Sequence, residues 1–246
     1  MRRRAYAALT FLLLASVNPR AETTCVDTSL LAHSAASITR YFDDEERKAQ
    51  TGFVGIQGTA WFQSPTTIVT IEHVVTAMGL STEDWKVLII EDDTNSRPIS
   101  VRLQRLVGGG SEKLAVLELR TAMSAARSVS IRMSPLKPED RVVTLAYPNR
   151  QPRSVGGRFV QYATEGRLAG TALLEMYEGN DRLAIDHGAS GAPVFDCEGR
   201  IAAVVSTVMT QIFQTPFGQM RLSTAWGTPN VVSVPIRELI ALQEGR

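Results

Sequence analysis

The 246-residue sequence predicts an all-β domain, organised as a barrel or a sandwich. Short runs rich in Val, Ile, Thr and aromatic residues follow one another, and Gly, Pro, Asn and Ser mark the turns between them. Within the runs, apolar and polar residues alternate with the period of two that is typical of strands, as in residues 53–62. The sequence contains no internal repeat and no low-complexity stretch.

The first 21 residues predict a secretory signal peptide. Arginines at positions 2–4 form a basic start, residues 5–17 form an apolar run, and the small residue Ala21 offers a cleavage site. The apolar run falls short of the roughly 20 residues that a membrane-spanning helix needs. We therefore expect cleavage after Ala21 rather than an uncleaved anchor, no membrane span in the mature protein, and a periplasmic or secreted location.

Charge and composition exclude several classes of function. Cleavage removes four of the 26 basic residues and none of the 25 acidic ones, leaving a net charge of −3. That balance lacks the basic excess of a nucleic-acid-binding protein, so no nucleic-acid partner is expected. The three histidines show no metal-ligand spacing and two cysteines alone form no zinc site, so no metal and no cofactor are expected. The oligomeric state is left open.

The two cysteines, Cys25 and Cys197, are candidates for a disulfide. Export delivers a protein to an oxidising compartment, where such a bridge forms and persists. The bridge would tie the N-terminal segment to the strand region after Ser190. Two unpaired cysteines are the alternative.

The N-terminal part of the mature chain is expected to be helical and the remainder to consist of strands. Residues 22–51 form the expected helical segment, whose apolar positions recur at near-helical spacing: Leu30, Leu31, Ile38 and Phe42. Strands are expected at residues 53–62, 67–70, 86–90, 99–107, 114–119, 142–146, 157–166, 171–175, 194–195, 201–209, 211–213 and 230–234. Residues 235–244 predict a closing helix with Pro235 at its first position.

A run of small residues around Ser190 makes this serine the candidate nucleophile. The sequence DHGASGAP at residues 186–193 lets the amides of Gly188 and Ser190 point into one small space and hold a developing oxyanion. A serine hydroxyl needs a base within hydrogen-bond reach. The β-rich residues 68–75 deliver His73, whose titration range suits proton transfer near neutrality. The alternatives are a turn serine and a histidine that is simply a surface or core residue.

The order of the two motifs, histidine before serine, resembles that of the trypsin-like (chymotrypsin-fold) serine peptidases. The likeness is greatest to their bacterial HtrA-like and glutamyl-endopeptidase-like branch. Further segments resemble strands of the family: GTAWF at 58–62, LAVL at 114–117, VVTLAYP at 142–148 and GRIAAVVS at 199–206. The resemblance covers roughly residues 52–244.

From the resemblance we expect one peptidase domain over residues 52–246. It implies two six-stranded antiparallel barrels, roughly residues 52–135 and 136–234, followed by the C-terminal helix. It also implies an exported serine endopeptidase that acts on a protein or peptide substrate, with His73 and Ser190 facing each other across the cleft between the barrels.

The third member of the expected catalytic group is not at its usual position. Where the family carries aspartate, this chain has Lys113, a cation that would repel a protonated His73. Glu112 is the preferred substitute, since the glycines at 108–110 give the preceding loop unusual freedom. The other interpretations are a carboxylate from elsewhere (Asp84, Glu91, Asp92 or Asp93), a weak Ser–His dyad, or an inactive site. If Lys113 fills the carboxylate slot, an aspartate there should raise turnover.

The adjacent Glu72 is expected to face away from His73, because neighbours on a strand point to opposite faces. The resemblance assigns substrate contacts as well. Ser206, Thr207 and Val208 match the strand edge that binds the substrate backbone, and His187 falls on the rim of the specificity pocket. Ala184 stands near the base of that pocket, where no acid is present, so a small or medium apolar side chain is the expected preference.

Two further features bear on activity. Ala189 stands where many animal members of the family carry an aspartate that pairs with a newly cut N-terminus, so activation by that route is not expected. A catalytically impaired protein that binds peptides is the alternative to a peptidase, because the strand edge at residues 206–208 would still accept an extended peptide by backbone pairing.

Overall fold

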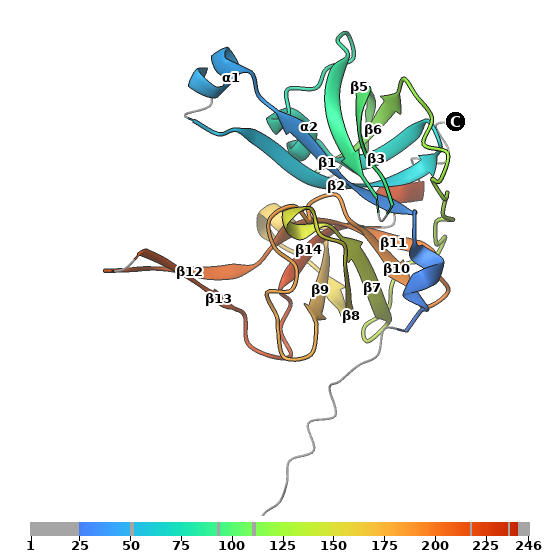
Figure 1. Ribbon diagram of the computed structural model, residues 1–246. Coiled ribbons are helices and arrows are strands. Elements are labelled where there is room, and N and C mark those ends of the chain that lie inside the picture. Colours follow the sequence, from blue (N-terminus) through green and yellow to red (C-terminus); the bar gives the residue numbers. More distant parts are fainter. Residues whose placement is uncertain are drawn as a thin grey trace, which may run out of the picture.

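The computed structural model describes residues 25–49, 52–92, 94–109, 112–216, 218–235 and 237–240. The signal peptide expected at residues 1–21 and the end of the expected C-terminal helix lie outside these ranges. Within them, two closed six-stranded antiparallel barrels pack against each other, and a two-stranded hairpin projects from the second barrel (Figure 1). The expected all-β fold with two six-stranded barrels is confirmed.

The first barrel is formed by the N-terminal half of the chain, in the strand order β1-β2-β3-β6-β5-β4. Its strands are β1 (Ala35–Tyr41), β2 (Gly55–Ser64), β3 (Thr67–Ile71), β4 (Lys86–Glu91), β5 (Ser96–Val107) and β6 (Leu114–Leu119). The core contains Trp61 and Phe62, both fully buried. A helix, α2 (Glu72–Ala77), follows β3 and packs beside the barrel.

The helix expected over residues 22–51 is wrong in its central part. The chain forms a short 3-10 turn, η1 (Thr28–Leu31), then strand β1, then the helix α1 (Asp44–Ala49). Strand β1 pairs with both β2 and β4 and thereby closes the barrel. Its residues before Tyr41 are buried on both faces, including Ser37 and Ile38. Tertiary pairing thus overrides the near-helical spacing of the apolar residues, and the first barrel begins at Ala35 rather than at residue 52.

The second barrel has the strand order β10-β11-β14-β9-β8-β7. Its strands are β7 (Arg141–Ala146), β8 (Arg153–Tyr162), β9 (Ala172–Tyr177), β10 (Pro193–Asp196), β11 (Ile201–Val208) and β14 (Val231–Pro235). Short 3-10 turns, η2 (Pro148–Arg150) and η3 (Gly166–Leu168), flank β8. Strand β8 begins at Arg153 rather than at residue 157. Residues 237–240 are helical, which agrees with the described part of the expected closing helix.

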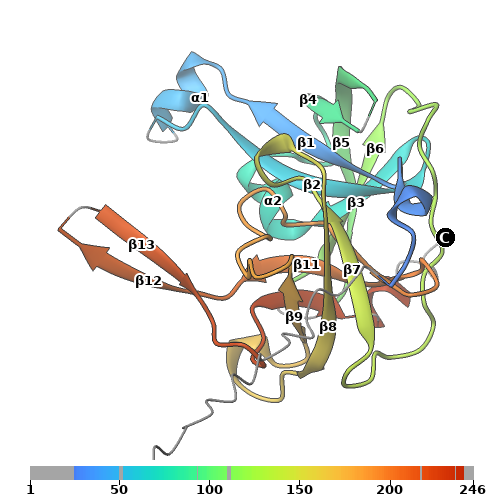
Figure 2. The same cartoon turned by 60° about the horizontal axis from the view of Figure 1, so that its bottom comes forward.

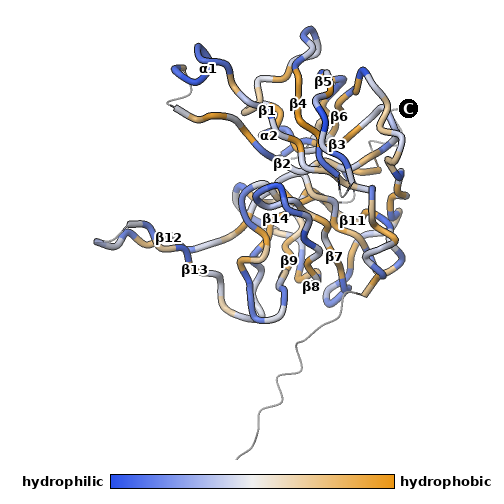
Figure 3. The backbone as a smooth tube through the Cα atoms, in the orientation of Figure 1, coloured by the Kyte–Doolittle hydropathy of each residue, from blue (hydrophilic) through white to orange (hydrophobic). Residues whose placement is uncertain are grey.

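The hairpin consists of β12 (Thr210–Thr215) and β13 (Gly218–Ser223), of which only β12 was expected. It extends away from the barrels on the same side as α1 (Figure 2). The barrel strands carry hydrophobic stretches, whereas α1 and the tip of the hairpin are hydrophilic (Figure 3). The hairpin nevertheless exposes a few large apolar side chains, among them Phe213 and Met220.

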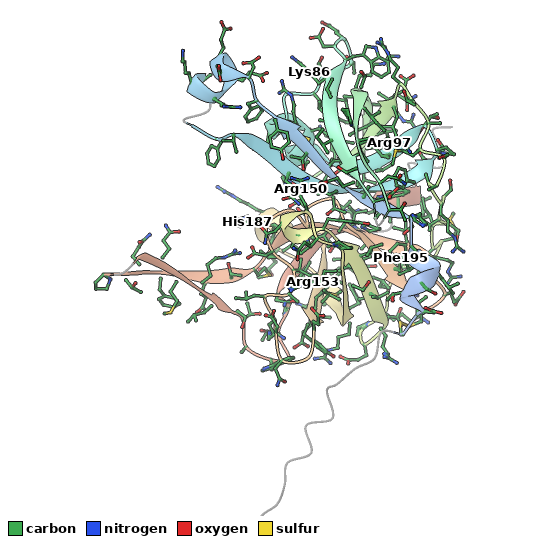
Figure 4. The ribbon with its side chains drawn as sticks, viewed as in Figure 1. Lys86, Arg97, Arg150, Arg153, His187 and Phe195 are labelled. Carbon is green, nitrogen blue, oxygen red and sulfur yellow. A yellow bond between two sulfur atoms is a disulfide. The ribbon has the colours of Figure 1, made fainter. Side chains whose placement is uncertain are left out.

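Polar contacts join the two barrels. The Tyr147 hydroxyl donates to the Ala35 carbonyl at 3.1 Å, and the Tyr147 amide donates to Thr59 Oγ1 at 3.1 Å. Arg150, which Figure 4 labels at the junction of the barrels, forms an ion pair with Glu91 on β4. These contacts tie residues of the two barrels to each other.

A disulfide joins Cys25 to Cys197, as expected, with the Cα atoms 5.1 Å apart. The bridge fastens the start of the described chain to the turn that follows β10. None of the described helices is long and apolar enough to cross a membrane. In the same residue ranges, no group of three or more His, Cys, Asp or Glu side chains is arranged to hold a metal ion.

Candidate active site

Ser190 lies in the sharp turn that leads into β10. Its hydroxyl donates to the Ser206 carbonyl at 3.0 Å, and its own carbonyl accepts from the Thr59 amide at 2.9 Å. Gly191 beside it has a φ of +89°, and a Cβ there would collide with Thr59 and Thr70. Only glycine fits at this close approach of the two barrels, so Gly191 allows the turn that carries Ser190 to pack against the first barrel.

The loop before Ser190 is held against the first barrel. The Gly188 carbonyl accepts from Thr59 Oγ1 at 2.7 Å, and Gly188 adopts a φ of +93° that favours glycine. Among the described residues, nothing accepts a hydrogen bond from the amides of Gly188 or Ser190. The two amides are therefore the candidate donors to an oxyanion.

His73 is the second residue of α2, not part of a strand as residues 68–75 suggested. The chain leaves β3 at Ile71, and the first helical turn then carries Glu72 and His73 outward. His73 keeps 45% of its side chain exposed and lines a cavity of about 330 Å³ together with Ser190, Gly188 and His187. The structure thus brings together the two residues that the sequence singled out.

Glu112 lies against His73. The carboxylate oxygen Oε1 accepts from the His73 amide at 3.1 Å and lies 3.2 Å from the ring nitrogen Nδ1. Burial of Glu112 opposes its ionisation, but the hydrogen bonds and charge of His73, with help from the Ser206 hydroxyl, outweigh it and hold the pKa below its ordinary value. Glu112 is therefore an anion aimed at the imidazole.

Lys113 faces a different part of the surface. Its Nζ lies 3.4 Å from Glu72 Oε1, and its carbonyl accepts from the Glu72 amide at 2.9 Å. Glu72 therefore engages Lys113 rather than the His73 ring, although the reason is the start of a helix and not strand alternation. Lys113, which the sequence suggested would repel a protonated His73, pairs instead with the carboxylate of Glu72.

The other carboxylates considered as substitutes lie elsewhere. Glu91 pairs with Arg150 at the junction of the barrels, and Asp92 Oδ1 accepts from the amides of Thr94 and Asn95, both at 2.8 Å. Asp84 is exposed beside Ser81. Asp93 lies outside the described residues. Of the described candidates, Glu112 alone contacts His73.

A second cavity of about 660 Å³ adjoins the first and shares His73 with it. It is lined by His73, Glu112, Arg167, Leu168, Thr171, Ser206, Thr207 and Val232. Ser206 sits at an irregularity in the pairing of β11 with β14, between Val205 and Thr207. The bulge frees the Ser206 carbonyl to meet Ser190, so the edge of β11 borders both the serine and this cavity.

Of the remaining residues predicted to bind substrate, only His187 lines one of the two cavities. His187 is almost fully exposed and lines the first cavity. Val208 is partly buried, and Ala184 is buried in the core of the second barrel. Neither Ala184 nor Val208 lines the two cavities.

Sequence reasoning missed several residues that shape the site. Gln57 donates to the Tyr147 carbonyl at 2.6 Å and borders Gly188, and Arg167 lines the larger cavity. Asp186 forms an ion pair with Arg221 on the hairpin. Thr59 lies in the GTAWF segment that resembles a strand of the family. Gln57 and Asp186 contact residues that are far away in the sequence, so no local pattern indicates their roles.

Comparisons with known proteins agree with this architecture. A family model described as a trypsin-like peptidase domain matches residues 58–204. No curated protein matches the chain. The chain is similar to the solved structure of the Rv3671c protease from M. tuberculosis in its active form, with a TM-score of 0.58 and 16% identity over 88% of this chain and 82% of that one.

Two further solved structures are similar to the chain. The serine endoprotease from Yersinia pestis has a TM-score of 0.57 and 16% identity, over 91% of this chain and 66% of that chain. Deg5 has a TM-score of 0.57 and 14% identity, over 87% of this chain and 88% of that chain. At these identities the likeness establishes the fold.

Proposed function

Because the chain belongs to the trypsin-like peptidase family, we propose that it is an exported serine endopeptidase that uses Ser190 as nucleophile and His73 as general base. The observation that carries the proposal is the Glu112 carboxylate, which meets His73 at both the amide and Nδ1. Glu112 takes the role of the orienting acid that the family fulfils with an aspartate.

The proposed reaction begins with the orientation of His73. An ionised Glu112 keeps the proton on Nδ1 and leaves Nε2 as the basic nitrogen. Ser190 Oγ attacks the carbonyl carbon of the scissile peptide, and its proton passes to Nε2. The positive charge that develops on the imidazole is stabilised by the Glu112 carboxylate beside it.

The negative charge of the tetrahedral intermediate falls on the former carbonyl oxygen. The amides of Gly188 and Ser190, which donate to nothing else among the described residues, are the proposed donors to that oxygen. His73 then gives its proton to the departing amine, and the acyl group stays on Ser190. A water molecule, activated by His73 in the same way, releases the acid and regenerates the serine.

One rotation precedes this sequence. In the described state the Ser190 hydroxyl donates to the Ser206 carbonyl, so it must turn toward His73 Nε2 before it can attack. Ser190 and His73 line the same cavity, and rotation of the serine side chain about its first torsion is the proposed movement. The edge of β11 at Thr207 and Val208, with the adjoining cavity, is the proposed seat of the substrate backbone.

Export of the protein is supported by two independent features. The N-terminal 21 residues have the pattern of a secretory signal, and Cys25 and Cys197 form a disulfide of the kind that persists in an oxidising compartment. We therefore propose a periplasmic or secreted location.

The second candidate function is peptide binding without turnover. The observation that favours it is the hydrogen bond from Ser190 to Ser206, which draws the hydroxyl away from His73. The two candidates separate in one experiment, in which the purified protein and its Ser190→Ala variant are treated with a fluorophosphonate probe. Labelling of the parent alone supports the peptidase, and an unlabelled parent that still binds peptides supports the binding protein.

A further inference from the structure

The loop that carries the proposed oxyanion donors is attached to the projecting hairpin. Arg221 on β13 forms an ion pair and a hydrogen bond with Asp186 Oδ1. Asp186 begins the loop that leads through Gly188 to Ser190, so the ion pair joins two segments separated by 35 residues in sequence. Among the described residues, no strand pairing links the hairpin to this loop.

Asp186 accepts two hydrogen bonds within the tight turn at residues 186–189. Its Oδ1 accepts from the His187 amide at 2.7 Å, and its carbonyl accepts from the Ala189 amide at 3.0 Å. These two bonds engage the amides on either side of Gly188. The Gly188 amide lies between them with no acceptor of its own among the described residues, and so it remains available for a substrate oxygen.

Residues outside the loop help to fix its conformation. Ala189, beside the nucleophile, has no charge with which to anchor the turn, and its side chain is buried. Thr59 holds the Gly188 carbonyl, but it exerts no ionic pull. Of the seven residues from Asp186 to Ala192, Asp186 has the only carboxylate, and Arg221 is the cation that meets it.

We propose that Arg221 is a positioning residue for the oxyanion site: by holding the Asp186 carboxylate, it keeps the turn at residues 186–189 in the form that directs the amides of Gly188 and Ser190 at the substrate oxygen. The inference rests on the proposed peptidase function. It assigns to the hairpin a part in catalysis although no hairpin residue lines the two cavities.

The electrostatics of the pair agree with a lasting contact. Burial alone would raise the pKa of Asp186, but Arg221, the His187 amide and the nearby His187 ring outweigh it and lower the pKa. The side chains of Arg221 and Asp186 are 26% and 37% exposed, so water screens the pair only in part. The carboxylate therefore stays ionised and bound to Arg221 at neutral pH.

The test compares Arg221→Met, Asp186→Asn and the double variant. Asparagine keeps an oxygen that can accept from the His187 amide but loses the charge that holds Arg221. With a peptide anilide that has alanine before the scissile bond, we expect each single variant to lower kcat about tenfold or more at unchanged KM. The full loss of one oxyanion donor, on the order of 10² to 10³, sets the upper limit. The double variant should be no worse than either single one, since both remove the same contact.

Two readouts separate positioning from general damage. Affinity for a peptide boronic acid, whose tetrahedral adduct places an oxygen in the oxyanion site, should fall in parallel with kcat, while affinity for the product peptide and the Tm stay as in the parent. Arg221→Lys should restore part of the loss. Arg102→Met, which breaks the similarly exposed pair with Glu118 on the first barrel, is the matched control and should leave kcat unchanged.

The outcomes distinguish this inference from the function on which it rests. If the parent is labelled by the fluorophosphonate probe and cleaves the anilide, but Arg221→Met does so equally fast, the positioning role is wrong and the peptidase stands. Additive losses in the double variant would also overturn it. If the parent itself is neither labelled nor active, the proposed function is wrong and the positioning role falls with it.

Discussion

One carboxylate oxygen of Glu112 meets both the amide and the ring nitrogen Nδ1 of His73, at 3.1 and 3.2 Å. The two contacts fix the imidazole relative to its own backbone. Glutamate reaches farther than aspartate by one methylene, and Glu112 stands one residue before the usual position of the family acid. The hydrogen bond from the Glu72 amide to the Lys113 carbonyl sets the register in which the longer side chain arrives at the ring.

Replacement of Glu112 by glutamine should lower kcat by roughly 10² to 10⁴. A neutral amide stabilises the imidazolium less and favours the wrong tautomer, and loss of the orienting acid costs on the order of 10⁴ in the serine-protease example. Steady-state kinetics with the peptide anilide measure the effect. Glu72→Gln is the matched control, because Glu72 is adjacent in sequence but engages Lys113. Equal kinetics for Glu112→Gln and the parent would remove Glu112 from the mechanism.

Replacement of Lys113 by aspartate should bring no gain in turnover. The resemblance alone predicted a gain, on the premise that Lys113 fills the slot of the family acid. Because Lys113 faces Glu72, an aspartate there would put two carboxylates side by side and leave His73 with the partner it already has. The comparison of kcat for this variant with that of the parent checks the point, and a rise of tenfold or more would contradict the geometry described for Glu112.

The sequence was sufficient for the architecture but not for its first strand. Alternating runs and turn residues located most of the barrel strands, since those signals are local. Residues 35–40 are buried on both faces, so they show no clean alternation, and their strand identity depends on pairing with β2 and β4. Strand β13 was missed for the opposite reason: its residues are mostly exposed, so no buried face produces an alternating pattern.

The candidate site likewise contains residues that local motifs predict and contacts that only the fold creates. Ser190, Gly188 and His73 belong to local motifs, and their residue types stood out against the chain around them. The sequence already favoured Glu112 over four other carboxylates, but its contact with His73 depends on a loop geometry that the sequence does not show. The pairing of Asp186 with Arg221 depends on where the hairpin folds back, which no spacing in the sequence encodes.

Removal of the disulfide should lower stability and leave the site chemically competent. Cys25→Ser, Cys197→Ser and the double variant should each lose about 2–4 kcal/mol of unfolding free energy, because the bridge closes a long loop. Neither cysteine lines the two cavities, so fluorophosphonate labelling of the folded variants should match that of the parent. Urea unfolding measures the loss. The single and double variants should agree, since each removes the same bond. Unchanged stability, or labelling lost from folded protein, would contradict this assignment.

The buried Glu175 should make stability depend on pH. Its carboxylate accepts from Arg158 Nη2 at 2.7 Å, from the Gly227 amide at 2.7 Å and from Arg182. Burial opposes ionisation, but these donors outweigh it and lower the pKa from the ordinary 4.5. The stabilisation is therefore fully present above about pH 4.5 and is lost as the pH falls through the lowered pKa of the folded state.

Replacement of Glu175 by glutamine isolates this contribution. The variant leaves the buried Arg182 without its anionic partner, so we expect it to lose about 3 kcal/mol of unfolding free energy at pH 7. The loss should shrink as the pH is lowered below 4.5, because the parent carboxyl then becomes neutral too. Urea unfolding from pH 3 to pH 7 measures both effects. Glu139→Gln is the control, since Glu139 pairs with Arg158 but is largely exposed and should change stability by less than about 1 kcal/mol. A Glu175→Gln loss that stays constant over this pH range would show that packing, and not the charge of Glu175, stabilises this part of the second barrel.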